Sequence, residues 1–104
     1  MERSSKTFII ISKDRLNSYR EVFLTWISEN GGYYAAVKNL DMLSEQDLFD
    51  SVGQAMEKVE RAHLSKHGGW CWAPMKIVEL LNFNEAYNSK ADPEYKEIVS
   101  ITYR

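Results

Sequence analysis

The sequence predicts an α+β fold, in which a small, mostly antiparallel sheet packs against two amphipathic helices. Short runs rich in β-branched and aromatic residues indicate strands, and two longer stretches have apolar residues at helical spacing. The expected order along the chain is strand, helix, strand, helix, strand, strand (β-α-β-α-β-β). A chain of 104 residues can bury one hydrophobic core, so residues 1–104 are expected to form a single domain.

The first expected strand runs from Thr7 to Ser12 and contains the apolar sequence Phe-Ile-Ile-Ile. Such a run, without polar alternation, is typical of a central strand that is buried on both faces. The stretch SKDRLNSYREVFLTWISENGG follows and predicts the first helix, because its apolar residues fall within about 100° of a helical wheel. These residues are Leu16, Tyr19, Phe23, Trp26 and Ile27.

Residues 33–38 predict a second strand, although two alanines in it favour a helix. The stretch LSEQDLFDSVGQAMEKVERAHLSKHGG predicts the second helix, with acidic residues near its start and basic residues near its end, as the helix dipole favours. Ser44 and Asp47 have the spacing of a capping-box variant. The stripe expected to face the core comprises Leu48, Val52, Ala55, Met56 and Val59.

Two further strands are expected, in MKIVELLNF and in YKEIVSITYR, with the polar stretch NEAYNSKADPE between them. The first is ambiguous, because Pro74 could equally begin a short helix. In the second, alternate residues from Tyr95 to Tyr103 are more apolar than those between them. This alternation predicts a strand with one exposed face.

No stretch is apolar and long enough to span a membrane, and the first residues do not form a signal-peptide pattern. The single cysteine, Cys71, cannot form an internal disulfide, which agrees with a reducing compartment. We therefore expect a soluble, cytoplasmic protein that does not associate with membranes.

Acidic residues are concentrated in residues 39–57, which contain no lysine or arginine. The five acids are Asp41, Glu45, Asp47, Asp50 and Glu57. On a helical wheel, Asp47, Asp50 and Glu57 point away from the apolar stripe and form an outward acidic ridge, which suits a basic protein partner. Lysine and arginine are not clustered as nucleic-acid binding normally requires, so we expect no nucleic-acid partner.

Residues 63–74, HLSKHGGWCWAP, are the strongest candidate for a metal or catalytic site. His63 and His67 are spaced to bind one metal ion from a helix, and Cys71 could be a third ligand. A fourth ligand is missing and His63 falls within the apolar stripe, so we expect a helix end with no metal and no other cofactor. Apolar surroundings would raise the pKa of the Cys71 thiol and make it unreactive. The expectation is therefore a protein without catalytic residues.

In overall type, the chain resembles the small, acidic, single-domain immunity proteins with which bacteria neutralise toxins in the cytosol, for instance in contact-dependent growth inhibition. The resemblance implies an antitoxin that covers a toxin domain, often a basic nuclease, by stoichiometric binding. The expected contact residues are the five acids of residues 39–57, with Tyr33 and Tyr34 nearby in sequence. Two alternatives stay open, a small metal- or thiol-dependent enzyme using His63, His67 and Cys71, and a phage-type regulatory subunit. The sequence leaves the oligomeric state open.

Overall fold

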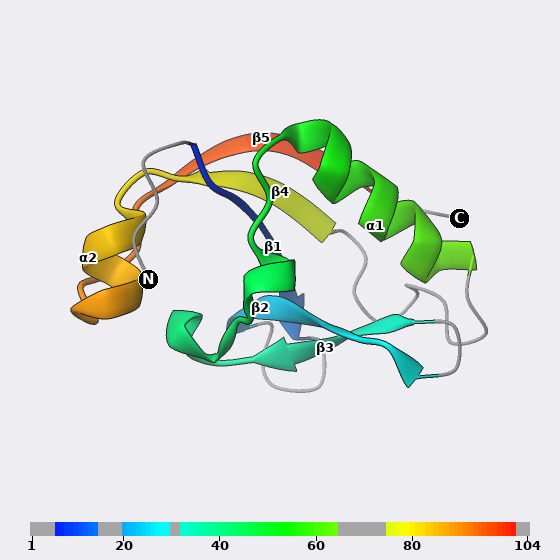
Figure 1. Ribbon diagram of the computed structural model, residues 1–104, viewed down its shortest axis with the longest axis horizontal. Helices are drawn as coiled ribbons and strands as arrows, with labels where there is room; N and C mark the ends of the chain where they lie inside the picture. The colour runs from blue at the N-terminus through cyan, green and yellow to red at the C-terminus, as the bar shows by residue number, and fades with distance from the viewer. Residues whose placement is uncertain (1–5, 15–19, 30–31, 65–74, 102–104) are drawn as a thin grey trace.

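The computed structural model describes residues 6–14, 20–29, 32–64 and 75–101. These residues contain one five-stranded antiparallel sheet with the strand order β3-β2-β1-β4-β5 (Figure 1). The strands are β1 (Phe8–Asp14), β2 (Arg20–Ile27), β3 (Tyr33–Val37), β4 (Met75–Leu80) and β5 (Tyr95–Ile101). The helices are α1 (Val52–Leu64) and α2 (Phe83–Asn88), and two 3-10 turns, η2 (Leu40–Met42) and η3 (Glu45–Asp47), precede α1. The predicted α+β class, with an antiparallel sheet and two helices, is confirmed. The predicted order is wrong, since the elements run β-β-β-α-β-α-β and α2 lies in a stretch predicted as the end of a strand and a polar connection.

The two helices cover opposite faces of the sheet, because alternate residues of the central strand β1 belong to different hydrophobic cores. Ile10 packs in the core that contains Val59 of α1. Ile9 packs in the core that contains Phe83 of α2. The predicted central strand is therefore confirmed, and its unbroken apolar run reflects burial on both faces.

The predicted first helix is wrong, since residues 20–27 form strand β2. Phe23 packs in the core on the α2 side, and Leu24 and Trp26 pack in the core on the α1 side. A strand that lies between two neighbouring strands can bury side chains on both of its faces. Its apolar residues then no longer alternate, and they can match helical spacing by coincidence. Pairing with β1 and β3 outweighs the helical pattern here. Leu16 and Tyr19 lie outside the described residues.

Helix α1 begins later than predicted, at Val52, and its described part ends at Leu64. The predicted capping box of Ser44 and Asp47 is present, but it caps the turn η3 instead of α1. Of the predicted stripe, Leu48, Ala55 and Val59 are buried and Val52 is half-buried. Met56 is 46% exposed and Ala62 is buried in its place.

The chain passes through the sheet between β1 and β2. The two strands pair from Ile11 with Phe23 to Asp14 with Arg20, and their remaining halves do not pair with each other. In the gap, Phe8 and Phe49 exchange two main-chain hydrogen bonds of 2.9 Å. Leu48 packs in the core on the α2 side and Phe49 in the core on the α1 side. Residues 47–49, the crossing segment, therefore connect the two faces of the sheet.

Strand β5 contains a β-bulge that the alternation of its residues does not reveal. Ile77 of β4 pairs with Val99 and the next residue, Val78, pairs with Glu97, so Ile98 is an extra residue in β5. Tyr95 consequently packs on the α2 side, whereas Val99 packs on the α1 side. The apolar residues of β5, predicted to share one face, are divided between the two faces.

Two glycines give opposite predictions for substitution by alanine. Gly32 has a φ of 99°, and a Cβ atom on it would lie 2.0 Å from Cζ2 of Trp26. We expect Gly32→Ala to lower the free energy of unfolding by about 2–4 kcal/mol, because it combines a steric clash with an unfavourable φ. Gly53 lies within α1, where a Cβ atom would meet Ser51 Oγ at 3.9 Å and nothing nearer. We expect Gly53→Ala to raise the free energy of unfolding by about 1 kcal/mol.

Urea unfolding followed by circular dichroism measures both effects. Equal stabilities for the two variants would contradict the placement of Gly32 against the Trp26 ring.

Candidate functional site

Asp47, predicted to lie on the outward ridge, is instead buried, with 1% of its surface exposed. Its Oδ1 accepts a hydrogen bond of 2.8 Å from the main-chain N–H of Trp26, and its Oδ2 accepts one of 2.6 Å from Thr25 Oγ1. Oδ2 also accepts hydrogen bonds from the N–H and Oγ of Ser44, at 3.0 and 3.1 Å. The prediction fails because residue 47 belongs to the turn η3, which directs its side chain toward β2.

The carboxylate of Asp47 completes the hydrogen bonding of β2 at the point where β1 has separated from it. The main-chain N–H of Trp26 faces this gap and donates a hydrogen bond to Asp47. The carboxylate takes the place of the carbonyl group that a neighbouring strand would otherwise provide. The same carboxylate closes the turn η3 through Ser44. Asp47 is therefore a structural residue that holds the crossing segment against the sheet.

The other four predicted acids are exposed: Asp41 on η2, Glu45 on η3, Asp50 before α1 and Glu57 on α1. We call these four residues the acidic surface. The side chains of Asp41, Glu45 and Glu57 make no hydrogen bond or ion pair with any residue that the structure describes. In Figure 1 the segment that carries them crosses from the β3 side of the molecule to the α1 side. Their side chains are exposed.

The two predicted aromatic contacts differ in exposure. Tyr34 is 4% exposed, and its ring packs edge-on to the ring of Trp26, with 5.2 Å between the centroids. Burial, and secondarily the negative charge of Asp47, raise the pKa of Tyr34. Tyr34 is therefore a core residue, and its side chain does not lie on the surface where a contact residue was expected. The side chain of Tyr33 faces the opposite side of the sheet from that of Tyr34, because successive residues of a strand point to opposite faces. On that side Tyr33 is half-buried.

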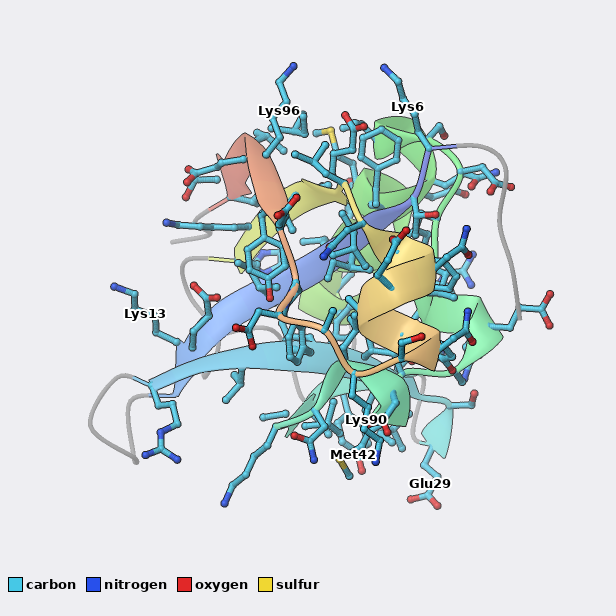
Figure 2. The ribbon with its side chains drawn as sticks, turned by 90° about the vertical axis from the view of Figure 1, so that its left-hand side faces the viewer. Lys6, Lys13, Glu29, Met42, Lys90 and Lys96 are labelled. Atoms are coloured by element: carbon cyan, nitrogen blue, oxygen red, sulfur yellow. The ribbon has the colours of Figure 1, made fainter. Side chains whose placement is uncertain are left out.

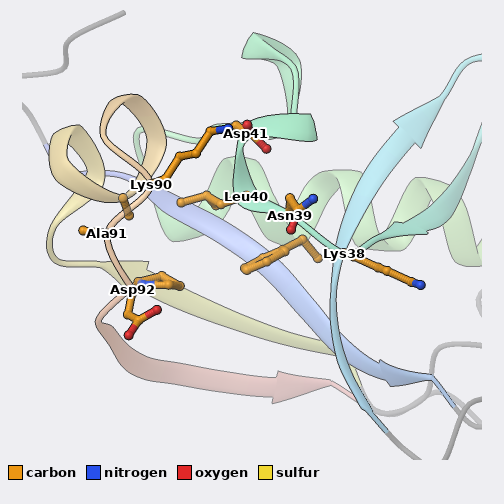
Figure 3. A pocket seen from close by; sticks show the side chains of 10 residues that line it. Lys38, Asn39, Leu40, Asp41, Lys90, Ala91 and Asp92 are labelled. Carbon is orange, nitrogen blue, oxygen red and sulfur yellow. The ribbon is translucent and has the colours of Figure 1, made fainter.

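Asp41 lines a hollow of about 280 Å³ between η2 and the residues that follow α2. Its lining includes the buried side chains of Phe23 and Leu40. Figure 3 shows the side chain of Lys90 extending toward Asp41, while Lys38 points away from the hollow. The φ of Lys90 is 58°, a left-handed conformation that is uncommon for lysine. The Asp-Pro sequence indicates a turn here, but sequence reasoning could not place that turn beside η2.

Glu57 lines a second hollow, of about 300 Å³, between α1 and the segment that contains η3. The side chains around it are Gln46, Leu48, Phe49, Gln54, Glu57, Lys58 and Arg61. Both hollows have volumes near the lower limit of about 300 Å³ that is typical of small-molecule sites. Each is better suited to a single side chain of a partner than to a cofactor.

One neighbour of the second hollow contributes to folding in a way that sequence reasoning missed. The Nζ of Lys58 lies 4.2 Å from the centroid of the Trp26 ring. A cation at this distance is attracted by the negative face of the ring. Helical spacing identifies Lys58 as a residue at the edge of the apolar stripe, but it does not show that Trp26 lies beneath it.

The candidate metal residues are only partly described. His63 is half-buried near the end of α1, whereas His67 and Cys71 lie outside the described residues. Within residues 6–14, 20–29, 32–64 and 75–101, no three histidines, cysteines or acids are grouped so that they could hold a metal ion. In the same ranges, no helix has the length and apolar character needed to cross a membrane.

Comparison with known proteins identifies no relative. No protein-family model, no curated protein and no solved structure matches the chain. Any function must therefore be inferred from the residues of the chain itself.

We predict that Asp47→Ala lowers the free energy of unfolding by about 3 kcal/mol, because it leaves the buried N–H of Trp26 without an acceptor. Asp41→Ala is the matched control, since Asp41 is exposed, and we expect it to change stability by less than about 0.5 kcal/mol. Urea unfolding of both variants measures the difference. A similar stability for the two variants would show that Asp47 does not hold the crossing segment.

Proposed function

We propose that this protein acts by binding another protein, without chemistry of its own, and that the partner presents a basic surface. The observation that supports this proposal is the exposure of four carboxylates on a segment that has no basic residue. The fifth acid, Asp47, is occupied by β2 and does not take part. Exposed carboxylates would accelerate encounter with a basic protein and restrict the choice of partner.

The surroundings of the acidic surface also suit a protein interface. Asp41 and Glu57 each line a hollow in which a partner could place a side chain. Met42 is 55% exposed beside Asp41, and Met56 is 46% exposed beside Glu57. Methionine is enriched in interfaces and adapts its shape to a partner.

The class of protein that best combines these features is a toxin-immunity protein or antitoxin of the bacterial cytoplasm. Its partner would be a basic toxin domain, for instance a nuclease, which it would neutralise by stoichiometric binding. Small size and an acidic surface support this proposal. A nuclease must carry basic residues to bind phosphates, and an acidic protein can cover those residues.

The proposal predicts a one-to-one complex with the protein encoded by the gene next to that of this chain. Co-expression, copurification and isothermal titration calorimetry would detect the complex and give its dissociation constant. Addition of salt should slow association, because steering between exposed charges is screened. A neighbouring protein that is acidic, or that shows no binding, would contradict the proposed function.

Charge reversal locates the interface within that complex. We expect Glu45→Lys combined with Glu57→Lys to weaken binding by about 100-fold, because each carboxylate would be replaced by a charge that repels the partner. Asp47 is left unchanged, since its replacement would destabilise the fold. The control is Glu85→Lys combined with Glu94→Lys, which makes the same change in net charge at exposed residues near α2 and β5. Equal weakening by both pairs would exclude the acidic surface as the specific contact.

A further inference from the structure

Residues 39–57, the segment that carries the acidic surface, expose two large apolar side chains, and both belong to methionines, Met42 and Met56. The leucines of the same segment, Leu40, Leu43 and Leu48, are buried. The large apolar group that this segment presents to solvent is therefore the thioether of methionine. A thioether adapts its shape to a binding partner, and it can also be oxidised.

Both methionines lie next to acids of the acidic surface. Met42 follows Asp41 on η2, and Met56 precedes Glu57 on α1. Figure 2 shows the side chain of Met42 projecting from the lower side of the molecule. In the function proposed above, a partner that binds these acids would therefore also cover the two thioethers.

The third described methionine, Met75 of β4, is protected from oxidants by the core. Its side chain is 2% exposed and packs in the core that contains Val59 of α1. When hydrogen peroxide oxidises a methionine, the sulfur gives up two electrons, an S–O bond forms, the O–O bond of the peroxide breaks and water is released. Because Met42 and Met56 are exposed and Met75 is buried, this reaction would change the surface of the folded protein and leave its core intact.

We propose that Met42 and Met56 are a modification site, at which oxidation by hydrogen peroxide to methionine sulfoxide weakens binding of the partner. A thioether favours an interface because it is apolar, whereas the oxygen of a sulfoxide must give up its hydrogen bonds to water when the partner covers it. Methionine sulfoxide reductases reverse the modification, so the effect can be switched off again. The effect on binding rests on the function proposed above, but the selective oxidation of the two residues does not.

Oxidation of the free protein tests the site without the partner. The full chain is treated with hydrogen peroxide, and peptide mapping by mass spectrometry follows the gain of one oxygen atom at each methionine. We expect Met42 and Met56 to be oxidised at least about tenfold faster than Met75 in the folded protein, and all three at similar rates in urea. Similar rates for the three residues in the folded protein would overturn the proposal.

Titration calorimetry with the protein encoded by the neighbouring gene tests the effect on binding. We expect peroxide treatment to weaken binding by about tenfold, and a methionine sulfoxide reductase to restore it. The matched control combines Met42→Leu with Met56→Leu, which keeps two apolar side chains that peroxide does not oxidise. This variant should bind like the untreated wild type, both before and after treatment.

Two results of the titration would overturn the proposal. One is unchanged binding by the oxidised wild type. The other is equal weakening of the leucine variant by peroxide, because the sensitive residue would then be another one, such as Cys71. A lack of binding by the untreated wild type would instead contradict the proposed function, and the effect on binding would fall with it. The two failures are therefore distinguishable.

Discussion

The structure depends on one buried carboxylate, that of Asp47, which lies where the strands β1 and β2 separate. Opening a sheet leaves main-chain groups without partners, and a buried N–H without an acceptor is costly. Asp47 supplies the acceptor for Trp26, and the exchange of hydrogen bonds between Phe8 and Phe49 supplies partners on the β1 side of the gap. Because both strands are satisfied in this way, the chain can pass between them and deliver α1 to one face while η2 stays on the other.

The turn that buries Asp47 also separates this acid from the other four acids of residues 39–57, which are exposed. Five acids lie close together in the sequence. The turn η3 directs Asp47 inward, whereas Asp41, Glu45, Asp50 and Glu57 are exposed. Exposed carboxylates contribute little to stability. In the proposed function, their role is recognition of a basic partner.

Local patterns in the sequence predicted the fold class, β1 and the body of α1, because the composition of these two elements matches their period. They also predicted β3 and β4, although two alanines in β3 favour a helix and Pro74 left β4 ambiguous. They failed at β2, where burial on both faces imitates helical spacing. They predicted β5 as a strand but did not reveal the bulge at Ile98, which divides its apolar residues between the two faces. The exposure of Asp41 and Glu57 could be predicted from their polarity. The burial of Asp47 could not, because it depends on a gap between two strands that are far from it in sequence.

The crossing segment has a consequence for how the molecule can unfold. Leu48 and Phe49 are consecutive residues, yet they belong to cores on opposite sides of the sheet. Unfolding of either core would displace the neighbouring residue that is packed in the other core. The two layers are therefore expected to unfold together, as one cooperative unit. A protein of this size thereby avoids having one face that opens while the other stays folded, and the acidic segment that we propose as the partner-binding surface is held in place for as long as the whole domain is folded.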